Sequence, residues 1–418
     1  MKYCGMNASR IQIPQIDGHV GTHDLGNGYF VSVHNRIEQV RRWWAQVVSD
    51  NDVFLRADYL SVLEAAPPQG MECWYLLLWS GSHPIGCIYL QLMHFEMGKS
   101  LRFERPAPTD CALQLWMDCL KRRLHRKVSF DVLICGNLLA TGMHGFHFVK
   151  ELDTSHTLSL CVQALEWFSS TYLPLQARQP EVVLVKDFPT TRRDIRQAFL
   201  GAQYRDFRFQ PNMVWQRRPH WHTFDDYLSD MSSKYRVRAR RAAKKAASLQ
   251  RQDLSLSDVR RYAPRLYALY KEIAEGADFN AFVLHPKYFL ELKEALGNNL
   301  VCSAWFEGTN LIGFNTAVRN GKSELVAHFL GFDPRYNPSH QIYLNMLYDL
   351  VARAIDMRVD RLVLGRTALE IKSSVGAQAQ EMSCFLRHRS ALHNSVMPFW
   401  VNCLEPKVAW KARHPFKH

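Results

Sequence analysis

The chain has 418 residues, of which 47% are hydrophobic and 22% are charged, and this composition excludes an intrinsically disordered protein. A chain of this length predicts two or three domains. Lysine and arginine outnumber aspartate and glutamate by 52 to 39. The net charge of +13 favours an anionic partner such as a phosphate group, a carrier protein, tRNA or an acidic membrane surface, although a basic surface without a special role has the same composition.

The ten cysteines are scattered without a Cys-x-x-Cys pair, so the sequence predicts neither a zinc site nor a redox motif. No window approaches the run of about 18 apolar residues that a membrane-spanning helix needs. The first residues also lack the charged-then-apolar pattern of a signal peptide. We therefore expect a cytoplasmic protein, with peripheral contact at the inner membrane face as an open alternative.

The first half of the chain predicts an α/β unit, because short apolar strands alternate with segments of helical periodicity. An insertion at about 94–127, with its own apolar helix around 113–120, interrupts this unit. His144 and His147 lie in a glycine-bearing loop but lack a clear third ligand, so no metal site is predicted. The predicted elements are a helix at 58–64, strands at 74–79, 84–90 and 128–135, a helix at 154–170, a strand at 182–185, a helix at 192–200 and a strand at 207–216.

A basic segment at 232–251 separates the two halves and holds eight lysine or arginine residues without an acid. Its periodicity predicts an amphipathic helix with alanines on one face and Arg238, Arg241 and Lys245 on another. One interpretation is a connector that covers part of the core. The other is a surface that binds an anion, namely tRNA, a carrier-protein phosphate or a lipid headgroup, through residues such as Arg238 and Arg241.

The second half repeats the order of the first. Tyr59 precedes an Ile-Gly pair at 85–86, and Tyr288 precedes another at 312–313, at similar distances. We therefore expect an α/β protein with two similar lobes, 1–222 and 280–418, joined by a basic helical connector at 223–279. The predicted elements are a helix at 286–292, strands at 300–306, 311–315 and 324–332, a helix at 340–357, a strand at 362–364, a helical turn at 369–375 and a strand at 382–388.

This layout resembles the tandem-lobed architecture of the GNAT superfamily, as found in Fem-type aminoacyl transferases and in bacterial GNAT lipid N-acyltransferases. The resemblance spans about 36–390 and rests on the order of elements and on three phrases: Ile-Gly at 312–313, His-Phe-Leu-Gly-Phe-Asp at 328–333, and Leu-Gly-Arg-Thr-Ala-Leu-Glu-Ile-Lys at 364–372. It implies transfer of an acyl group from acyl-CoA or an acyl-carrier protein to the amine of a small acceptor, for example an amino-lipid precursor. It implies no tightly bound cofactor.

Two alternatives remain open at this point. One is a Fem-like transferase that uses aminoacyl-tRNA as its donor. The other is a non-catalytic protein that binds nucleic acid or a membrane surface through a degenerate GNAT scaffold.

The loop at 333–339 departs from the pattern of simple GNAT enzymes, in which a glycine-bearing loop before a helix holds the CoA pyrophosphate through backbone N–H groups. The loop in this chain has no glycine, so it cannot copy that close approach. Arg335 and Ser339 remain candidates to meet a phosphate. Tyr343 and Asn345, early in the next helix, are candidates to contact the donor, although a plain helix surface is the simpler interpretation.

The resemblance also implies where the chemistry takes place, since the fourth and fifth strands of a GNAT lobe diverge and the thioester and the amine meet in the gap. His328 lies on the fourth strand and is a candidate base, or else a packed histidine. Arg366 follows the fifth strand and is a candidate to bind an anionic group of the acceptor. Glu370 is a candidate base or ammonium ligand, and Lys372 a candidate substrate ligand. The alternative for Arg366 and Glu370 is a structural ion pair at i,i+4 spacing.

Overall fold

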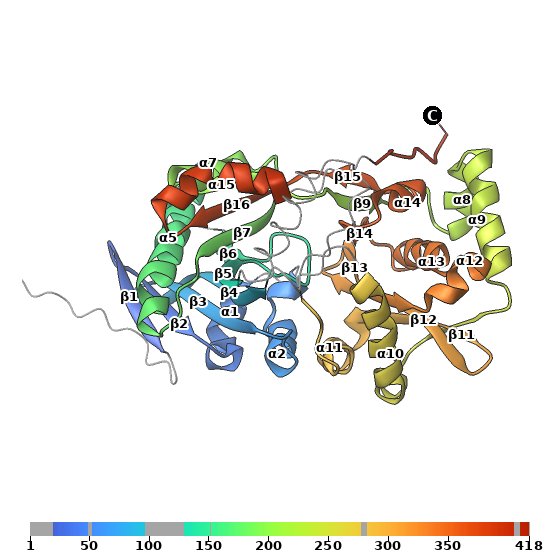
Figure 1. The fold of residues 1–418 in the computed structure, drawn as a ribbon, viewed down its shortest axis with the longest axis horizontal. Helices are drawn as coiled ribbons and strands as arrows, with labels where there is room; N and C mark the ends of the chain where they lie inside the picture. The colour runs from blue at the N-terminus through green and yellow to red at the C-terminus, as the bar shows by residue number, and fades with distance from the viewer. Residues whose placement is uncertain are drawn as a thin grey trace, which may run out of the picture.

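The protein forms two lobes that lie side by side, each built on one mixed β-sheet with helices on both faces (Figure 1). The structure is a computed structural model that describes residues 20–48, 52–96, 129–150, 152–276, 282–404 and 410–417. The predicted α/β class and the two lobes are confirmed. The predicted insertion falls, from residue 97 onward, outside the described residues.

The first sheet is built mainly from the first half of the chain. Its face with the long helix buries Leu76 and Leu78, while the opposite face buries Tyr75 and Trp79, as the period of two of a strand requires. In sheet order its strands are β1 (Gly21–Gly26), β2 (Tyr29–His34), β3 (Met71–Ser80), β4 (His83–Glu96), β5 (Ser129–Cys135), β7 (Val182–Pro189), β16 (Met382–His388) and β8 (Arg205–Arg208), with β6 (Phe146–Phe148) paired to β4.

Helices cover both faces of the first sheet. On one face lie η1 (Ile37–Gln39), α1 (Arg41–Val47), η2 (Val53–Leu55) and α2 (Ala57–Ala65). On the other lie α5 (Thr154–Trp167), η3 (Phe168–Tyr172), α6 (Leu173–Leu175) and α7 (Arg193–Gly201). Asp153 accepts a hydrogen bond from the backbone N–H of His156 and so caps the start of α5.

The second sheet has the strand order β10 (Gln250–Asp253), β11 (Leu300–Glu307), β12 (Asn310–Asn320), β13 (Glu324–Phe332), β14 (Arg361–Gly365), β9 (Asn212–Gln216) and β15 (Gln378–Gln380). One face carries α10 (Leu256–Gly276), α11 (Tyr288–Leu296) and η4 (Gly297–Asn299). The other carries α8 (Phe224–Asp230), α9 (Ser233–Lys245), η5 (Pro334–Tyr336), α12 (Asn337–His340), α13 (Ile342–Asp356) and α14 (Leu369–Ser374). Helix α13 forms as predicted, because Leu344, Leu347, Val351 and Ile355 share its buried face.

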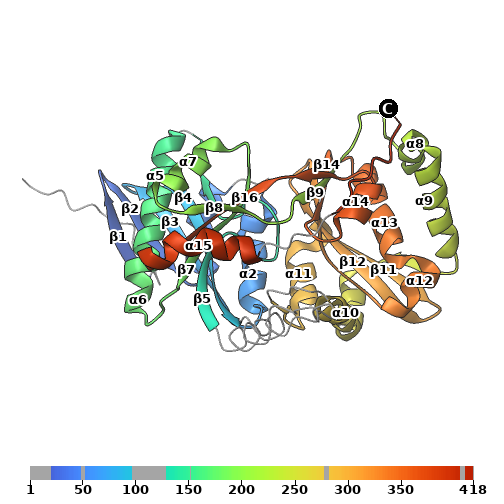
Figure 2. The ribbon, with the colours of Figure 1, turned by 45° about the horizontal axis from the view of Figure 1, so that its top comes forward.

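The two halves of the chain exchange one strand each. Strand β16, from the predicted second lobe (280–418), lies between β7 and β8 of the first sheet, and β9, from the predicted first lobe (1–222), lies between β14 and β15 of the second. Figure 2 shows β16 running from the second lobe into the first. The predicted boundaries at 222 and 280 therefore do not separate the two sheets, because each sheet is continuous only with a strand from the other half.

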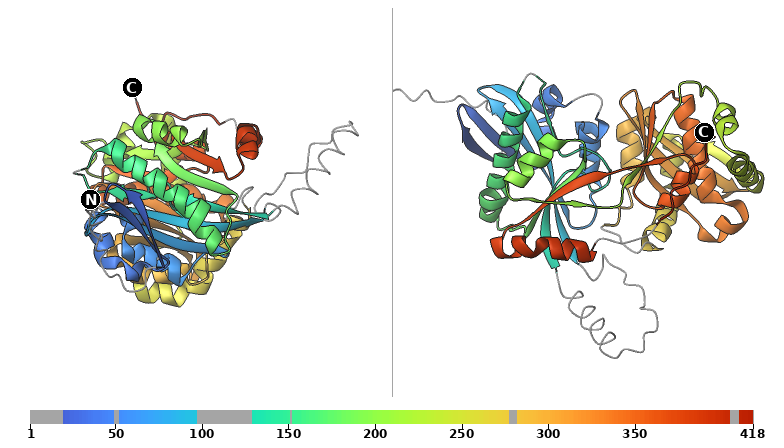
Figure 3. Two further views of the ribbon diagram at one scale, coloured as in Figure 1. Left: turned by 90° about the vertical axis from the view of Figure 1, so that its left-hand side faces the viewer. Right: turned by 90° about the horizontal axis from the view of Figure 1, so that it is seen from above.

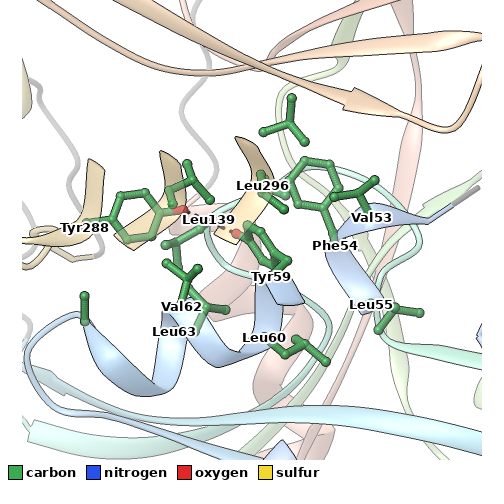
Figure 4. Close-up of a cluster of buried hydrophobic side chains, with 14 of the residues drawn as sticks. Val53, Phe54, Leu55, Tyr59, Leu60, Val62, Leu63, Leu139, Tyr288 and Leu296 are labelled. Atoms are coloured by element: carbon green, nitrogen blue, oxygen red, sulfur yellow. Dashed lines mark hydrogen bonds between the residues drawn. The ribbon is translucent and has the colours of Figure 1, made fainter. Parts of the chain in front are cut away.

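The lobes also share one hydrophobic core, which packs α2 against α11. Leu60 and Leu63 of α2 and Leu292 of α11 belong to this core. Tyr59 and Tyr288 point toward each other across the junction, as Figure 4 shows. The repeated tyrosines of the sequence thus meet in space.

After β16 the chain continues in α15 (Ala391–Leu404), which packs beside β8 and β16 of the first lobe (Figure 3). Residues 410–417 then lie against the second lobe, where Phe416 forms a β-bridge with Met231. None of the described helices is long and apolar enough to cross a membrane.

The basic helix is shorter than the predicted 232–251. Helix α9 ends at Lys245, and Arg251 lies in strand β10, where its guanidinium pairs with Asp349 and Asp253. Arg251, which was predicted to lie in the last turn of the helix, thus forms ion pairs with acidic side chains in β10 and α13.

The exchanged strand gives a stability prediction. Phe385 of β16 is buried and packs against Phe188 and Phe199 of the first lobe. We expect Phe385→Ala to lower the free energy of unfolding by about 3–5 kcal/mol, measured by urea denaturation. Leu392→Ala, at an exposed position of the following helix α15, is the control and should change it by less than about 0.5 kcal/mol. Equal effects of the two substitutions would contradict the exchange.

Candidate active site between the two lobes

Both sheets open at the carboxyl end of their central parallel strand pair. In the second sheet, β13 and β14 are paired from Glu324–Arg361 to Val326–Val363 and then separate. In the first sheet, β5 and β7 are paired as far as Cys135–Val185. The residues that follow each pair come together at the junction of the lobes.

His328 lies just beyond the last paired residue of β13. Its Nε2 is 2.6 Å from the Tyr288 hydroxyl, which is 3.4 Å from the Tyr59 hydroxyl. Asn137 of the first lobe donates its side-chain N–H to Tyr59 Oη at 3.2 Å. A chain of hydrogen bonds therefore runs from the opening of the second sheet to that of the first.

The environment of His328 makes it a poor match for a base at neutral pH. Its ring is enclosed by the rings of Phe54, Tyr59, Tyr288 and Phe329, although the residue as a whole keeps some exposed surface. Burial lowers the pKa of His328 to about 3. The imidazole is therefore neutral at pH 7 and only weakly basic.

Asp187 forms ion pairs with one residue of each lobe, beside the two openings. It lies in β7 with no exposed surface and in the left-handed backbone region, at a φ of 72°. Lys186 Nζ donates to Asp187 Oδ2 at 2.5 Å, and Arg366 of the second lobe donates to Oδ1. Burial opposes the charged carboxylate, but Lys186 and Arg366 outweigh it, so that the pKa of Asp187 lies below its usual value.

Arg366 lies in the gap, with one end fixed by this ion pair. Its guanidinium also lies over the ring of Phe209, 5.6 Å from the ring centre. Its Nε is buried and has no hydrogen-bond partner within the described part of the chain. An unused, buried N–H is costly unless a ligand satisfies it, and this supports the predicted role of Arg366 in binding an acceptor.

Arg366 and Glu370 do not form the ion pair that the sequence suggested as an alternative. Helix α14 begins only at Leu369, so Arg366 precedes it and the i,i+4 spacing does not bring the two side chains together. Glu370 instead pairs with Arg413 of the C-terminal segment. The predicted roles of Glu370 as a base or an ammonium ligand stay predictions.

Lys372 of α14 is buried, and its ammonium group makes no ion pair or hydrogen bond with any other described residue. Its Nζ lies 4.0 Å from the position that a Cβ would take on Gly365, the last residue of β14. Burial lowers the pKa of Lys372 to about 7. Lys372 is thus the group beside the gap whose proton affinity suits proton transfer near neutral pH.

The side chains that were predicted to bind the donor in the loop at 333–339 already have partners within that loop. Arg335, whose side chain is largely exposed, makes a bidentate ion pair with Asp333. Ser339 Oγ is 3.2 Å from the carbonyl oxygen of Tyr336, and Asn337 Oδ1 accepts from the backbone N–H of Tyr343 at 3.2 Å. The backbone N–H of Tyr343, at the start of α13, therefore already has a partner and is not free to donate to a phosphate group.

Two further donor candidates serve the packing of α13. Asn345 donates to the carbonyl oxygen of Ala242 at 3.0 Å and so joins α13 to α9. Tyr343 stacks on Phe332, and burial raises the pKa of its hydroxyl. In the first lobe the carboxylate of Asp153 caps α5, which disfavours a phosphate at that helix start.

Helix α9 presents the predicted basic face beside this loop. Ala239 and Ala242 are buried, whereas Arg238 and Arg241 are exposed and form no ion pair with any residue that the structure describes. Lys245 Nζ donates to the carbonyl oxygen of Pro338 at 3.1 Å, which holds the end of α9 against the loop.

Sequence reasoning missed the first-lobe contribution to this site. Lys186, Asp187 and Asn137 were not candidates, and the one available signal was the repeated tyrosine at 59 and 288. The loop histidine His144 pairs with Asp52 at 2.9 Å. Within the described ranges, no group of three histidine, cysteine, aspartate or glutamate side chains could hold a metal ion.

Comparisons with known proteins agree with this arrangement. Residues 233–373 match the family model of the acetyltransferase (GNAT) domain, and this segment contains β13, β14, His328, Arg366 and Lys372. No curated protein matches the chain.

Solved structures with a similar course of the chain have low sequence identity. A tandem GNAT protein from the clavulanic acid biosynthesis pathway is 9% identical over 80% of this chain and 88% of its own, with a TM-score of 0.44. A conserved protein of unknown function from Bacteroides thetaiotaomicron is 8% identical over 84% and 95%, with a TM-score of 0.47. L-PGS from Bacillus licheniformis is 8% identical over 83% and 94%, with a TM-score of 0.44.

These TM-scores lie below 0.5, so the likeness to a GNAT domain rests on the family match at residues 233–373. A GNAT domain implies an acyl thioester as donor and an amine as acceptor. Residues 233–373, which contain β13, β14 and α13, are therefore similar to an acetyltransferase (GNAT) domain, and they lie in the second of the two α/β lobes.

Proposed function

We propose that the protein is an N-acyltransferase that joins an acyl group from a thioester donor to the amine of a small acceptor, in the gap between β13 and β14. The observation that carries this proposal is the loss of pairing after Val326 and Val363, within the segment that matches the GNAT domain. Such a gap holds two reactants in contact, which converts a reaction between separate molecules into one within a complex.

The reaction needs an acceptor for one proton. The amine nitrogen attacks the thioester carbonyl carbon, the C–N bond forms and the C–S bond breaks. The nitrogen loses a proton to the base, and a proton is returned to the sulfur, which leaves as the thiol. Lys372 suits this step better than His328, because its pKa is about 7 and that of His328 about 3. We assign the proton transfer to Lys372 and the positioning of the acceptor to His328 with Tyr288.

Arg366 indicates the chemical class of the acceptor. Asp187 holds the guanidinium in place, and the buried Nε is left to donate to a carboxylate, sulfonate or phosphate. An acceptor with both an amine and an anionic group, such as an amino-lipid precursor, binds Arg366 through the anionic group and presents its amine to Lys372.

The donor is acyl-CoA or an acyl-carrier protein, and α9 supports a polyanionic carrier. Arg238 and Arg241 lie on the exposed face of a helix held against the loop before α13. An aminoacyl-tRNA donor is the second candidate, and the same basic face favours it. The match to an acetyltransferase domain favours an enzyme over a non-catalytic binding protein.

The first test is metabolite and lipid profiling of a strain without the gene. We expect one N-acylated amine to disappear and to return with the wild-type gene, but not with Lys372→Met. This substitution keeps the apolar stem and removes the amine, so the protein should still fold. With the acceptor identified, Lys372→Met should lower turnover by about 10²-fold or more.

The pH dependence separates a base from a structural residue. Lys372 accepts a proton only when neutral, so the wild-type rate should fall as the pH decreases through about 7, and Lys372→Met should lack this limb. Lys271→Met, at a half-exposed position of α10, is the control and should keep the wild-type profile. An unchanged profile in Lys372→Met would remove Lys372 from the mechanism, and an unchanged metabolite profile in the deletion strain would contradict the proposed function.

The basic face of α9 gives a second test. We expect Arg238→Ala combined with Arg241→Ala to weaken donor binding by about tenfold at low ionic strength and by less as salt is added. Affinities for acyl-CoA, an acylated carrier protein and anionic vesicles show which partner the face serves. Arg42→Ala, an exposed arginine of α1, is the control. Unaltered binding of all three partners would leave α9 as a connector only.

A further inference from the structure

A second basic site lies in the first lobe, away from α9. A groove of about 730 Å³ runs along one side of α7 and is closed by Arg208 of β8 and Ser383 of β16. Its size falls within the range of small-molecule sites. Because β16 comes from the other half of the chain, the groove is complete only when the two halves have exchanged their strands.

Three arginines line this groove and no acidic side chain does. Arg196 pairs with Asp206 at 2.7 Å, so its charge is matched. Arg193 and Arg208 are exposed and form no ion pair with the residues that the structure covers. The groove therefore carries about two unmatched positive charges, which favour an anionic ligand.

The other lining groups suit a phosphate ester. The hydroxyls of Thr190 and Ser383 line the groove and form no hydrogen bond elsewhere in the described ranges. Guanidinium groups bind phosphate oxygens through paired N–H groups, and hydroxyls add single donors. Leu200, which is partly exposed, adds an apolar contact for the organic part of such a ligand.

The groove and the interlobe site use neighbouring residues of β16. Ser383 precedes Cys384, whose thiol is 3.6 Å from Asp187 Oδ1. Arg208 precedes Phe209, the ring over which Arg366 lies. Because side chains alternate along a strand, Ser383 faces the groove and Cys384 faces Asp187, so the groove and the Asp187–Arg366 ion pair share β16 but lie on opposite faces of the sheet.

We propose that the groove beside α7 binds a small molecule that carries a phosphate ester, with Arg193 and Arg208 as its phosphate ligands. The site is separate from the loop before α13, where a GNAT domain holds its donor. Two unmatched charges fit a small molecule better than a nucleic acid, which contacts many phosphates along an extended surface. The proposal does not depend on the transfer reaction.

The test is calorimetric titration of the full chain with inorganic pyrophosphate and with CoA as probes. We expect binding of at least one probe, and Arg193→Ala combined with Arg208→Ala should weaken it on the order of tenfold or more. Circular dichroism checks that the variant is folded. Arg42→Ala, an exposed arginine of the same lobe without an ion pair among the described residues, should bind as the wild type does.

The outcomes against the proposal are distinct. Absence of binding of both probes, or equal affinity of the double variant and the wild type, would overturn it. Binding of anionic vesicles or a short RNA that needs Arg193 and Arg208, without binding of pyrophosphate or CoA, would replace it with a macromolecular surface. Lys372→Met should bind the probes normally, so a failure of the transfer reaction is distinguishable from a failure of this site.

Discussion

The buried carboxylate of Asp187 couples the two lobes at the candidate site. A carboxylate without exposed surface costs several kcal/mol unless cations and hydrogen bonds match it. One matching cation, Lys186, comes from the same lobe, and the other, Arg366, from the opposite lobe. Separation of the lobes would remove one of the two cations that match this charge, so their relative position is coupled to the ion pair that also orients Arg366 in the gap.

The exchanged strands also join the two lobes. The openings of the two sheets differ in the environment of the lysine that lies beside each of them. In the first sheet, Lys186 fills the opening and donates to the carbonyl oxygens of Asn137 and Ala140, so its amine is satisfied. In the second, Lys372 has no such partners among the described residues, and burial lowers its pKa. The same residue type is thus a structural cation in one lobe and, in the proposed function, a base in the other.

Elements with a strong local pattern could be predicted from the sequence, as α13 and β13 show, and so could the presence of two similar lobes, which the repeated Tyr59 and Tyr288 indicated. The sheet to which β16 belongs could not, because an apolar strand pattern does not specify its partners. The ion pair between Asp187 and Arg366 joins residues 179 positions apart and leaves no local signal. Local spacing alone suggested Glu370 as the partner of Arg366, and the late start of α14 prevents that pair.

A double-mutant cycle on Asp187 and Arg366 tests the central claim most directly. The free energy of unfolding is measured for the wild type, Asp187→Asn, Arg366→Met and the double variant. Each single substitution should cost about 3–5 kcal/mol because it leaves a buried charge unmatched. We expect a coupling energy of about 1–3 kcal/mol, whereas costs that add within about 0.5 kcal/mol would show that the two residues act independently and that the ion pair does not couple the lobes.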